Sequence, residues 1–299
     1  MKVCANSRRL GGIFDMSNFD STATRPLPRM KAEQPAPAAP AAKTETNAVF
    51  RPDMIYADSH RGLVRHGNQD SFAYTVRDEG NLVFMLVADG IGGNEGGDLA
   101  SRFVSEMLLR DFQAYRQDPD QNPDKQMIAF LKKCLILANS ALKNLNRNYN
   151  IAHPMGTTVA VLVLTPEKAY TAHAGDSRVY RLRKGELKHL TQDHSIVAEL
   201  VRSGKLTEEE AKSHPMAHVI SQSIGVRTDI KPDFSVYDHQ PGDRYMICSD
   251  GVLLHLADPG IHQVLAAAKN ARDAVRNLIT LGLRGGGGDN ITSLCAFTE

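Results

Sequence analysis

The sequence has almost no excess of charge of either sign, because 34 aspartates and glutamates balance its 35 lysines and arginines. A net charge of +1 lacks the basic excess that proteins use when nucleic acid is their main partner. An apolar fraction of 42% with 23% charged residues is ordinary for a globular protein with a sizeable core. The composition therefore argues against a polyanion-binding protein and against a chain that is disordered throughout.

Long apolar runs are also missing. The longest, at 82–88 and 159–164, are much shorter than the roughly 18 to 20 residues that a helix needs to cross a bilayer. The first twenty residues contain Lys2, Arg8 and Arg9 but no continuous apolar stretch of the kind found in secretory signals. We therefore expect neither a membrane span nor a secretory signal.

Cysteine is scarce, and Cys4, Cys134, Cys248 and Cys295 are scattered without CxxC spacing. This pattern offers neither a zinc site nor a disulfide framework, and it is typical of the reducing cytoplasm. We therefore interpret the cysteines mostly as small core residues and expect a cytoplasmic protein.

Residues 1–50 show little apolar periodicity and include a Pro/Ala-rich tract at 35–42. Such a tract is typical of an extended, solvated linker. We expect 1–50 to be a disordered tail and 51–299 to form a single domain, since no Pro/Gly/Ser-rich break interrupts the second part. The composition leaves open whether the tail docks a partner or is only a spacer.

Short runs rich in β-branched and aromatic residues, bounded by turn residues, predict many strands. Other stretches repeat their apolar residues at helical spacing. The strands come in adjacent groups and do not alternate strictly with helices, which favours antiparallel sheets with helices outside, an α+β layered sandwich. Strands are predicted at 54–59, 71–77, 82–88, 157–164, 168–174, 178–183, 218–223, 233–237, 244–249 and 290–297. Helices are predicted at 99–112, 127–145, 195–203, 208–213 and 259–282.

Four aspartates stand at the ends of predicted buried strands. Asp89 and Asp250 each end an apolar run and are followed by glycine. Asp289 follows four glycines and precedes the last strand, and Asp70 opens the strand at 71. Acidic groups gathered at one edge repel one another unless they are protonated or neutralised by cations. Because oxygen ligands suit Mg²⁺ and Mn²⁺, we hypothesise a site for two divalent ions.

Two further residues fit this hypothesis. Gly90 can offer a carbonyl oxygen where a side chain would not fit, and Arg65 has a planar guanidinium whose donors match phosphate oxygens. Two ions about 3.5 to 4 Å apart can share a water, lower its pKa and clamp a transferring phosphoryl group. Taken singly, each Asp-Gly pair is more often a turn, a glycine run a flexible loop, and an arginine a surface residue. We favour the metal site because these features occur together.

The sequence resembles the metal-dependent protein phosphatases of type 2C, specifically the compact bacterial Ser/Thr phosphatases. The similarity runs in order from Ala57 to Phe297. Each motif is weak by itself, whereas eight in the family's order are specific. The motifs lie at 58–65 with 68–70, 87–93, 155–158, 174–178, 190–194, 214–215 with 220–225, 248–251 and 288–292.

The resemblance implies a four-layer αββα sandwich of two antiparallel sheets flanked by helices, with a binuclear Mn²⁺ or Mg²⁺ centre at one edge. By motif, Asp89 would bridge the two ions and Gly90 would lend its carbonyl to one of them. Asp250 and Asp289 would bind the other ion. Asp70 would hold waters that are bound to the metals.

The resemblance also implies roles outside the ligand set. Arg65 would bind the substrate phosphate, and a water or hydroxide bridging the ions would attack phosphorus directly, without a phosphoenzyme. Asp176 is interpreted as mainly structural, closing a turn together with Arg178, and Asp193 is assigned no role. The polar, helical segment 195–217 would form a flap beside the site. Packing or surface roles are expected for His66, His173, His194 and His255.

Two departures from the family concern mechanism. Ile91 stands where animal and plant relatives often have a histidine proposed to protonate the leaving group, so no side-chain acid is assigned. Many bacterial relatives help to hold a third ion with an aspartate just before Met-Gly-Thr-Thr, whereas this chain has His153 and Pro154 there. A third site built on Asp250 alone would be weak, and we expect His153 to be a surface residue.

We therefore expect a metal-dependent phosphatase that hydrolyses phosphoserine and phosphothreonine in proteins and counteracts a bacterial Ser/Thr kinase. Its partners would be phosphorylated proteins and that kinase, with no nucleic acid, and the chain would act as a monomer. The rival hypothesis is a catalytically silent module that binds phosphoproteins or a kinase. Degenerate family members usually lose metal aspartates, and all the core ones are present here.

Overall fold

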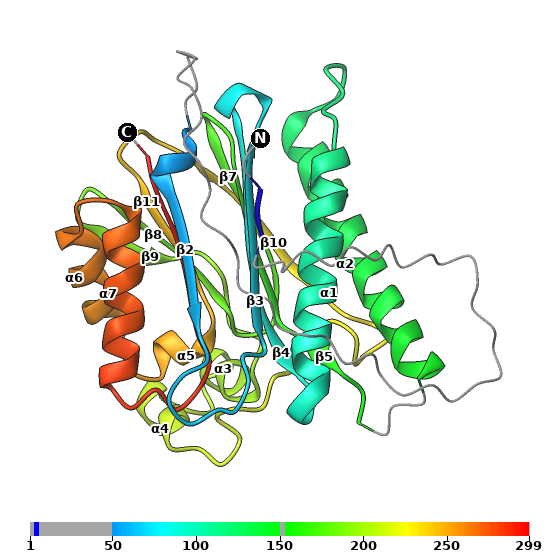
Figure 1. Ribbon diagram of the computed structural model, residues 1–299, viewed down its shortest axis with the longest axis vertical. Coiled ribbons are helices and arrows are strands. Elements are labelled where there is room, and N and C mark those ends of the chain that lie inside the picture. The colour runs from blue at the N-terminus through cyan, green and yellow to red at the C-terminus, as the bar shows by residue number, and fades with distance from the viewer. Residues whose placement is uncertain (1–2, 6–49, 150–152, 299) are drawn as a thin grey trace.

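The computed structural model describes residues 3–5, 50–149 and 153–298, which form four layers of secondary structure (Figure 1). Two sheets pack face to face, and each sheet is covered on its outer face by a pair of helices. All strand pairings described below are antiparallel. The α+β sandwich expected from the sequence is thereby confirmed.

The first sheet runs in the order β1-β3-β4-β6-β7-β10, and β5 pairs with β4 outside this path. Its strands are β1 (Val3–Ala5), β3 (Asp70–Arg77), β4 (Leu82–Ile91), β5 (Gly156–Thr157), β6 (Val159–Leu164), β7 (Lys168–Ala174) and β10 (Asp233–Asp238). The second sheet runs in the order β2-β12-β11-β8-β9. Its strands are β2 (Ile55–His60), β8 (Arg178–Arg183), β9 (Glu186–His189), β11 (Arg244–Cys248) and β12 (Ile291–Phe297).

Helices α1 (Gly93–Ala114) and α2 (Pro123–Asn148) cover the first sheet, and α6 (Asp258–Ala267) and α7 (Ala271–Arg284) cover the second (Figure 1). Three short helices, α3 (Ile196–Arg202), α4 (Glu208–Lys212) and α5 (Asp250–Leu253), lie together at the lower end of the molecule in Figure 1. Short 3₁₀ turns occupy Pro52–Met54 and Asp78–Gly80.

Strand β4 shows why its sequence is apolar without interruption. Successive side chains of a strand point to opposite faces of the sheet. Val83, Met85 and Val87 pack in the core between the two sheets, whereas Phe84 and Leu86 pack in the core under α1 and α2. Because both faces are buried, the run cannot alternate with polar residues, and the strand carries Asp89 near its C-terminal end.

Several predicted elements differ from the observed ones. The expected helix at 259–282 is two helices, because Ala268 is extended and the Asn270 side chain accepts from the Asp273 N–H at 2.9 Å to begin α7. The expected strand at 218–223 is wrong, since this polar stretch makes only an isolated bridge between Ser195 and Ile220. Strand β9 and helix α5 were not predicted.

Two parts of the expected N-terminal tail lie among the described residues, Val3–Ala5 and Phe50. Residues Val3–Ala5 pair with β3 at Ala73–Thr75 as an edge strand. Phe50 is buried, and its backbone N–H donates to the Gly80 carbonyl at 2.8 Å. The division into a disordered tail at 1–50 and a single domain at 51–299 stays a prediction. The Pro/Ala tract at 35–42 lies outside the described residues.

Across the described ranges, none of the helices combines the length and the hydropathy that a bilayer span requires. Cys134, Cys248 and Cys295 are buried and unpaired, as expected for small core residues.

Candidate metal centre

Two of the predicted aspartates face each other across neighbouring strands. Asp70 begins β3, and in the register of the β3–β4 pair it lies directly opposite Asp89. Asp70 is only 5% exposed. Strand β4 does not stop at Asp89, as the sequence suggested, but continues to Ile91 before α1 begins. The antiparallel register therefore brings two carboxyl groups together that are 19 positions apart in sequence.

Asp250 comes from the other sheet. It is the first residue of α5, which follows β11 after the N-cap residue Ser249, so the second Asp-Gly pair opens a helix and does not form a turn. The carboxyl groups of Asp89 and Asp250 lie within hydrogen-bonding range of each other. Two carboxyl groups this close do not both ionise unless a cation offsets their charge; otherwise one of them keeps its proton.

The electrostatics of the group follow from burial and from this crowding. Burial raises the pKa of Asp70 to about 7, hydrogen bonds with Thr292 and Ser249 oppose the rise, and the charges of Asp250 and Asp289 add to it. Burial also raises the pKa of Asp89 well above its usual value, with further increases from the charges of Asp70 and Asp250. The pKa of Asp250 rises through burial and the nearby charge of Asp289. The charged forms are therefore destabilised without a cation.

Unpartnered oxygens indicate that a cation fits here. The Oδ1 atoms of Asp70, Asp176 and Asp250 are buried and have no hydrogen-bond partner among the described residues. Buried polar atoms normally have a partner, so several orphans in one place require an explanation. Carboxylate oxygens are hard ligands of the kind that Mg²⁺ and Mn²⁺ prefer. The residues present thus fit the divalent ions that the resemblance implies.

Arg65 and Asp289 are brought together at the rim of this group. Arg65 Nη2 donates to Asp289 Oδ2 at 2.7 Å, and this bond raises the pKa of Arg65. The Arg65 side chain remains 53% exposed. A guanidinium in this position can bind an anion that approaches from solvent. The structure therefore gathers all the aspartates predicted for the site, with Asp289 turned toward Arg65.

Gly90 lies where no other residue fits. A Cβ atom at this position would come within 2.0 Å of the Gly97 carbonyl oxygen and 2.8 Å of the Gln69 carbonyl oxygen. The Gly90 N–H donates to that same Gln69 carbonyl at 3.1 Å. The close approach of three backbone segments explains why a glycine follows Asp89.

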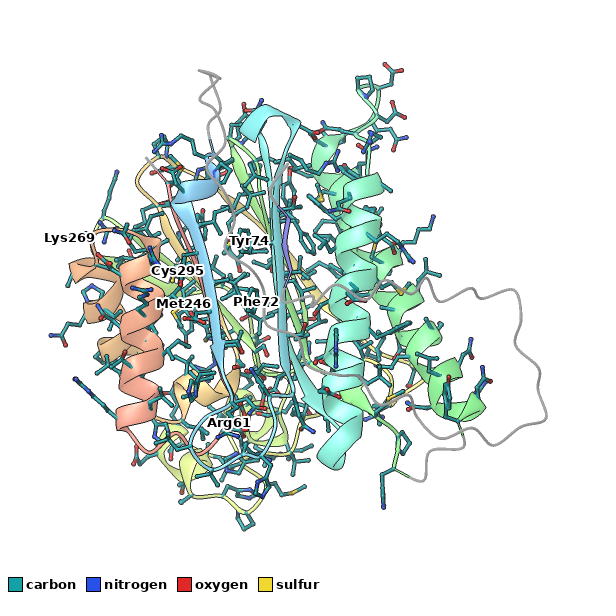
Figure 2. The ribbon with its side chains drawn as sticks, in the orientation of Figure 1. Arg61, Phe72, Tyr74, Met246, Lys269 and Cys295 are labelled. Atoms are coloured by element: carbon teal, nitrogen blue, oxygen red, sulfur yellow. The ribbon has the colours of Figure 1, made fainter. Side chains whose placement is uncertain are left out.

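Asn290, which the sequence interpretation did not assign, holds the loop that carries Arg65. Its Nδ2 donates to the carbonyl oxygens of Arg61 at 2.8 Å and Gly67 at 2.9 Å, and its Oδ1 accepts from the Gln69 N–H at 2.8 Å. Asn290 is buried. Figure 2 labels Arg61 at the lower end of the molecule, where this loop leaves β2. One amide thus fixes both ends of the Arg65 loop beside Asp289.

Hydroxyl groups fix the two facing aspartates. Ser249 Oγ donates to Asp70 Oδ2 at 2.7 Å and accepts from the Thr292 N–H at 3.1 Å. The Asp89 N–H donates to Thr158 Oγ1 at 3.0 Å. These residues lie inside motifs that carry the family resemblance, which was the available signal, but the sequence alone gave them no role.

The expected role of Arg178 is wrong. Arg178 was expected to close a turn with Asp176, but its Nε and Nη2 bind Asp193 at 2.9 and 2.6 Å. Its Nη1 donates to Tyr180 Oη at 2.8 Å. The loop after β9 places Asp193 against the guanidinium, so Asp193, which had no assigned role, is the partner. The carboxyl group of Asp176 lies near Asp250 instead.

One group of three possible ligands lies outside the acidic group. Among the described residues, only the donor atoms of His173, His194 and Asp233 lie within 4.8 Å of one another, and no three of the acidic residues of the candidate centre come that close. However, the two imidazole rings stack with centroids 4.5 Å apart and planes at 18°. Lone pairs in two nearly parallel, stacked ring planes do not converge on one ion. His194 Nε2 lies 3.1 Å from Asp233 Oδ2, so the geometry describes a hydrogen-bonded packing cluster.

The two residues that depart from the family pattern, Ile91 and His153, and the predicted flap lie as follows. Ile91 pairs with Gly156 at the end of β4. His153 is exposed, as expected. The predicted flap begins with α3, whose Ser195 cap accepts from the Ala198 N–H at 3.3 Å, and continues through α4.

Comparisons with known proteins identify the family. The family model for protein phosphatase 2C matches residues 59–277. The serine/threonine protein phosphatase PstP of Mycobacterium tuberculosis is 35% identical over 240 residues, which cover 80% of this chain and 44% of that protein. The chain thus spans less than half of PstP. The protein phosphatase PhpP of Streptococcus pneumoniae is 33% identical over 231 residues, covering 77% of this chain and 92% of PhpP.

A solved structure is also similar. The catalytic domain of the serine threonine protein phosphatase PstP in complex with two manganese ions superposes with a TM-score of 0.69 at 31% identity. The match covers 82% of this chain and 98% of that domain. The chain therefore shares its two-sheet α+β sandwich with a solved phosphatase catalytic domain. The chain belongs to the protein phosphatase 2C family.

Proposed function

We propose that this chain is a metal-dependent protein phosphatase that hydrolyses phosphoserine and phosphothreonine in proteins. The observation that carries the proposal is the placement of Asp70 opposite Asp89, with buried, unpartnered Oδ1 atoms on Asp70 and Asp250 and with the Arg65–Asp289 pair at the rim. Family membership and the protein phosphatase names of PstP and PhpP support the same activity.

In this proposal Asp89, Gly90, Asp250 and Asp289 hold two Mn²⁺ or Mg²⁺ ions, and Asp70 holds waters around them. When bound, the ions would lower the pKa of a shared water and offset charge on the phosphoryl group. The manganese complex of the PstP catalytic domain supports this assignment. The charge of the aspartates would then be neutralised by cations, which removes the cost of their burial.

Arg65 binds the substrate phosphate in this proposal. Its bond to Asp289 uses one N–H and leaves other donors of the half-exposed guanidinium accessible to phosphate oxygens. Asn290 keeps this guanidinium in place by fixing the loop on both sides. Binding and orientation of the phosphate are therefore the contribution of the 61–69 loop.

We propose direct attack on phosphorus, without a phosphoenzyme. Cys248 is close to Asp250 in sequence, but it is fully buried, and burial raises the pKa of its thiol far above neutrality. A thiol in that state is a poor nucleophile. Phosphorylated proteins would be the substrates of a cytoplasmic, monomeric enzyme that opposes a Ser/Thr kinase.

The test is hydrolysis of a phosphothreonine peptide by the purified full chain with MnCl₂. We expect Asp89→Asn and Asp250→Asn each to lower kcat by about 10³-fold or more, because each removes charge from the metal centre. Asp238→Asn, on a side chain that is 73% exposed, is the matched control and should keep wild-type turnover. Wild-type hydrolysis by both centre variants would overturn the metal assignment.

The rival hypothesis of a catalytically silent binding module predicts the opposite result for the wild-type chain. Such a module would bind the phosphothreonine peptide without turnover in Mn²⁺ or in Mg²⁺. Measuring peptide binding and phosphate release on the same sample separates the two.

A further inference from the structure

Two large apolar side chains are exposed immediately before Arg65 in the sequence. Leu63 and Val64 are each 66% exposed, the highest value among the large apolar residues that the structure describes. A single exposed leucine is normal on a protein surface, whereas adjoining exposed apolar groups beside a binding position mark contact surfaces. This pair adjoins the proposed phosphate position.

The backbone of the loop holds these two residues at the surface. The Leu63 N–H donates to the Gly287 carbonyl at 2.8 Å, and the Val64 N–H donates to the same oxygen at 3.4 Å. Gly62 has a φ of +79°, and a Cβ there would come within 2.2 Å of the Asp289 carbonyl oxygen. The loop therefore cannot fold Leu63 and Val64 inward without breaking the contacts that fix it.

A third exposed leucine extends this surface toward the acidic group. Leu254 is 45% exposed, and its N–H donates to the Asp250 carbonyl at 2.9 Å, so the two residues are one helical turn apart. The next residue, His255, lies against Gly285, and Leu63 lies against the same glycine run two positions further on. The three side chains thus follow one edge of the site, and we call Leu63, Val64 and Leu254 the apolar rim.

The position of Arg65 indicates what covers the apolar rim. In the proposed function Arg65 binds the phosphate of a phosphorylated residue, and the next residue of the same peptide has its Cα only about 3.8 Å away. Because Val64 directly precedes Arg65, a side chain that flanks the phosphorylated residue can reach the rim while the phosphate stays in place. A permanent cover, such as another part of this chain or a second copy, would instead obstruct Arg65.

We propose that the apolar rim is a substrate subsite that takes an apolar side chain next to the phosphorylated residue. The inference rests on the proposed function and narrows its substrates to phosphoproteins with an aliphatic or aromatic residue beside the phosphoserine or phosphothreonine. Binding removes that side chain and the rim from water together, which stabilises the complex. Leu63 and Val64 thereby determine specificity, while the metal centre and Arg65 act on the phosphate.

The first test compares two phosphothreonine peptides, one with leucine and one with serine on both sides of the phosphothreonine, hydrolysed by the full chain with MnCl₂. We expect kcat/KM of the wild type to be about 10-fold higher for the leucine peptide, since one apolar contact gives discrimination of this order. Combining Leu63→Ser with Val64→Ser should lower this ratio to about 2-fold or less. The ratio compares two substrates of one enzyme, so a general loss of activity cancels.

A second pair of neighbouring exposed apolar residues supplies the matched control. Ile136 and Leu137 on α2 are 44% and 45% exposed, and their combined replacement by serine should keep the wild-type ratio. A wild-type ratio near one, or an unchanged ratio in the Leu63 and Val64 double variant, would overturn the proposal. If that variant does not fold, Leu63→Ala with Val64→Ala is measured in its place, and failure of both to fold counts against the proposal.

The second test identifies the occupant directly by photocrosslinking. With the photoreactive p-benzoyl-phenylalanine in place of Val64, we expect a crosslink to the leucine beside the phosphothreonine, located by mass spectrometry. Crosslinks to residues 6–49 of the chain or to a second copy, with none to the peptide, would assign the rim to those occupants and reject the subsite.

Failure of the proposed function is distinguishable from failure of the subsite. A wild-type chain that hydrolyses neither peptide would overturn the function, and fluorescence anisotropy of the same labelled peptides with Mn²⁺ would then decide the inference. Dissociation constants that differ about 10-fold in favour of the leucine peptide would support the subsite, and equal constants would reject it. Equal hydrolysis of both peptides would reject the subsite alone.

Discussion

At the scale of single residues, glycines decide how closely the acids can approach. A Cβ on Gly90 would overlap the Gly97 carbonyl, and a Cβ on Gly251 would come within 1.9 Å of the Asn290 carbonyl oxygen. Both contacts are with backbone, which cannot rotate away as a side chain can. Each glycine follows an aspartate of the proposed metal centre, so the site requires small residues beside its charges.

Gly90→Ala should therefore be strongly destabilising. We expect a loss of about 1 to 3 kcal/mol in the free energy of unfolding, as for other overpacked sites, because β4 or the start of α1 must shift. Urea unfolding measures this loss. Gly288→Ala is the control, since no atom lies within 4 Å of its Cβ position. Equal stability of the two variants would show that the contact at Gly90 relaxes at no cost.

The sequence could predict the acids but not the residues that orient them. Asp70, Asp89, Asp250 and Asp289 stand beside glycines or strand ends, which is visible in a linear pattern. Asn290 instead acts through hydrogen bonds from its side-chain amide to a loop more than 220 positions away. Hydrogen bonds over that separation are defined by the folded topology, so composition and periodicity do not reveal them.

At the scale of elements, α2 holds both the loop before β5 and the loop that ends the flap region. Asn146 Nδ2 donates to the carbonyl oxygens of Met155 at 2.8 Å and Gly225 at 3.0 Å, and its Oδ1 accepts from the Met155 N–H at 3.1 Å. Asn139 Oδ1 accepts from the Gly225 N–H at 2.8 Å. Two buried amides on one helix face thus connect α2 to segments that flank the metal centre.

Asn146→Ala should destabilise the chain through this connection. It leaves buried backbone groups of Met155 and Gly225 without partners, at about 1 to 3 kcal/mol for each group that water cannot reach. Thermal unfolding with Mn²⁺ is the measurement. Asn144→Ala, on the exposed face of the same helix, should be neutral or slightly stabilising because alanine favours helices. Similar Tm values for the two variants would contradict the role of Asn146.

The periodicity of apolar residues predicted elements well where one or both faces of the element are buried. It predicted them poorly where a capping residue sets the start or end of a helix. The strand at 82–88 and the helix at 127–145 were found because their apolar residues follow the geometry of burial. The break between α6 and α7 was missed because apolar spacing continues across it, while the Asn270 cap starts a new helix. The polar stretch 218–223 lacks the buried face that a strand requires.

At the scale of the whole molecule, a chain with net charge +1 concentrates negative charge at one end of its sandwich. Asp70 and Asp89 come from the first sheet, Asp250 and Asp289 from the ends of strands in the second. The four layers bury these ends, so the surrounding water cannot screen the repulsion as it does at a surface. Stability without metal should therefore depend on the protonation of this group.

The pH dependence of the metal-free protein has a definite sign. A carboxyl group whose pKa is 3.8 when unfolded and about 7 when folded binds more protons in the folded state between these values. The free energy of unfolding therefore falls as pH rises, and the contribution is lost once pH passes the folded pKa. In EDTA, Asp70 and Asp176 should together make the protein less stable at pH 8 than at pH 6.5, by about 1 kcal/mol per group.

Urea unfolding in EDTA at the two pH values tests this prediction. The range from pH 6.5 to pH 8 avoids most of the contribution of His189. Burial lowers the pKa of His189 to about 4, so its contribution has the opposite sign but acts mainly below pH 6.5. Asp70→Asn should reduce the difference between the two pH values, whereas Asp238→Asn should not. With Mn²⁺ the trend should reverse, because the ions bind deprotonated carboxylates and displace their protons as pH rises. Greater stability at pH 8 in EDTA would mean that these acids are not crowded as the structure has them.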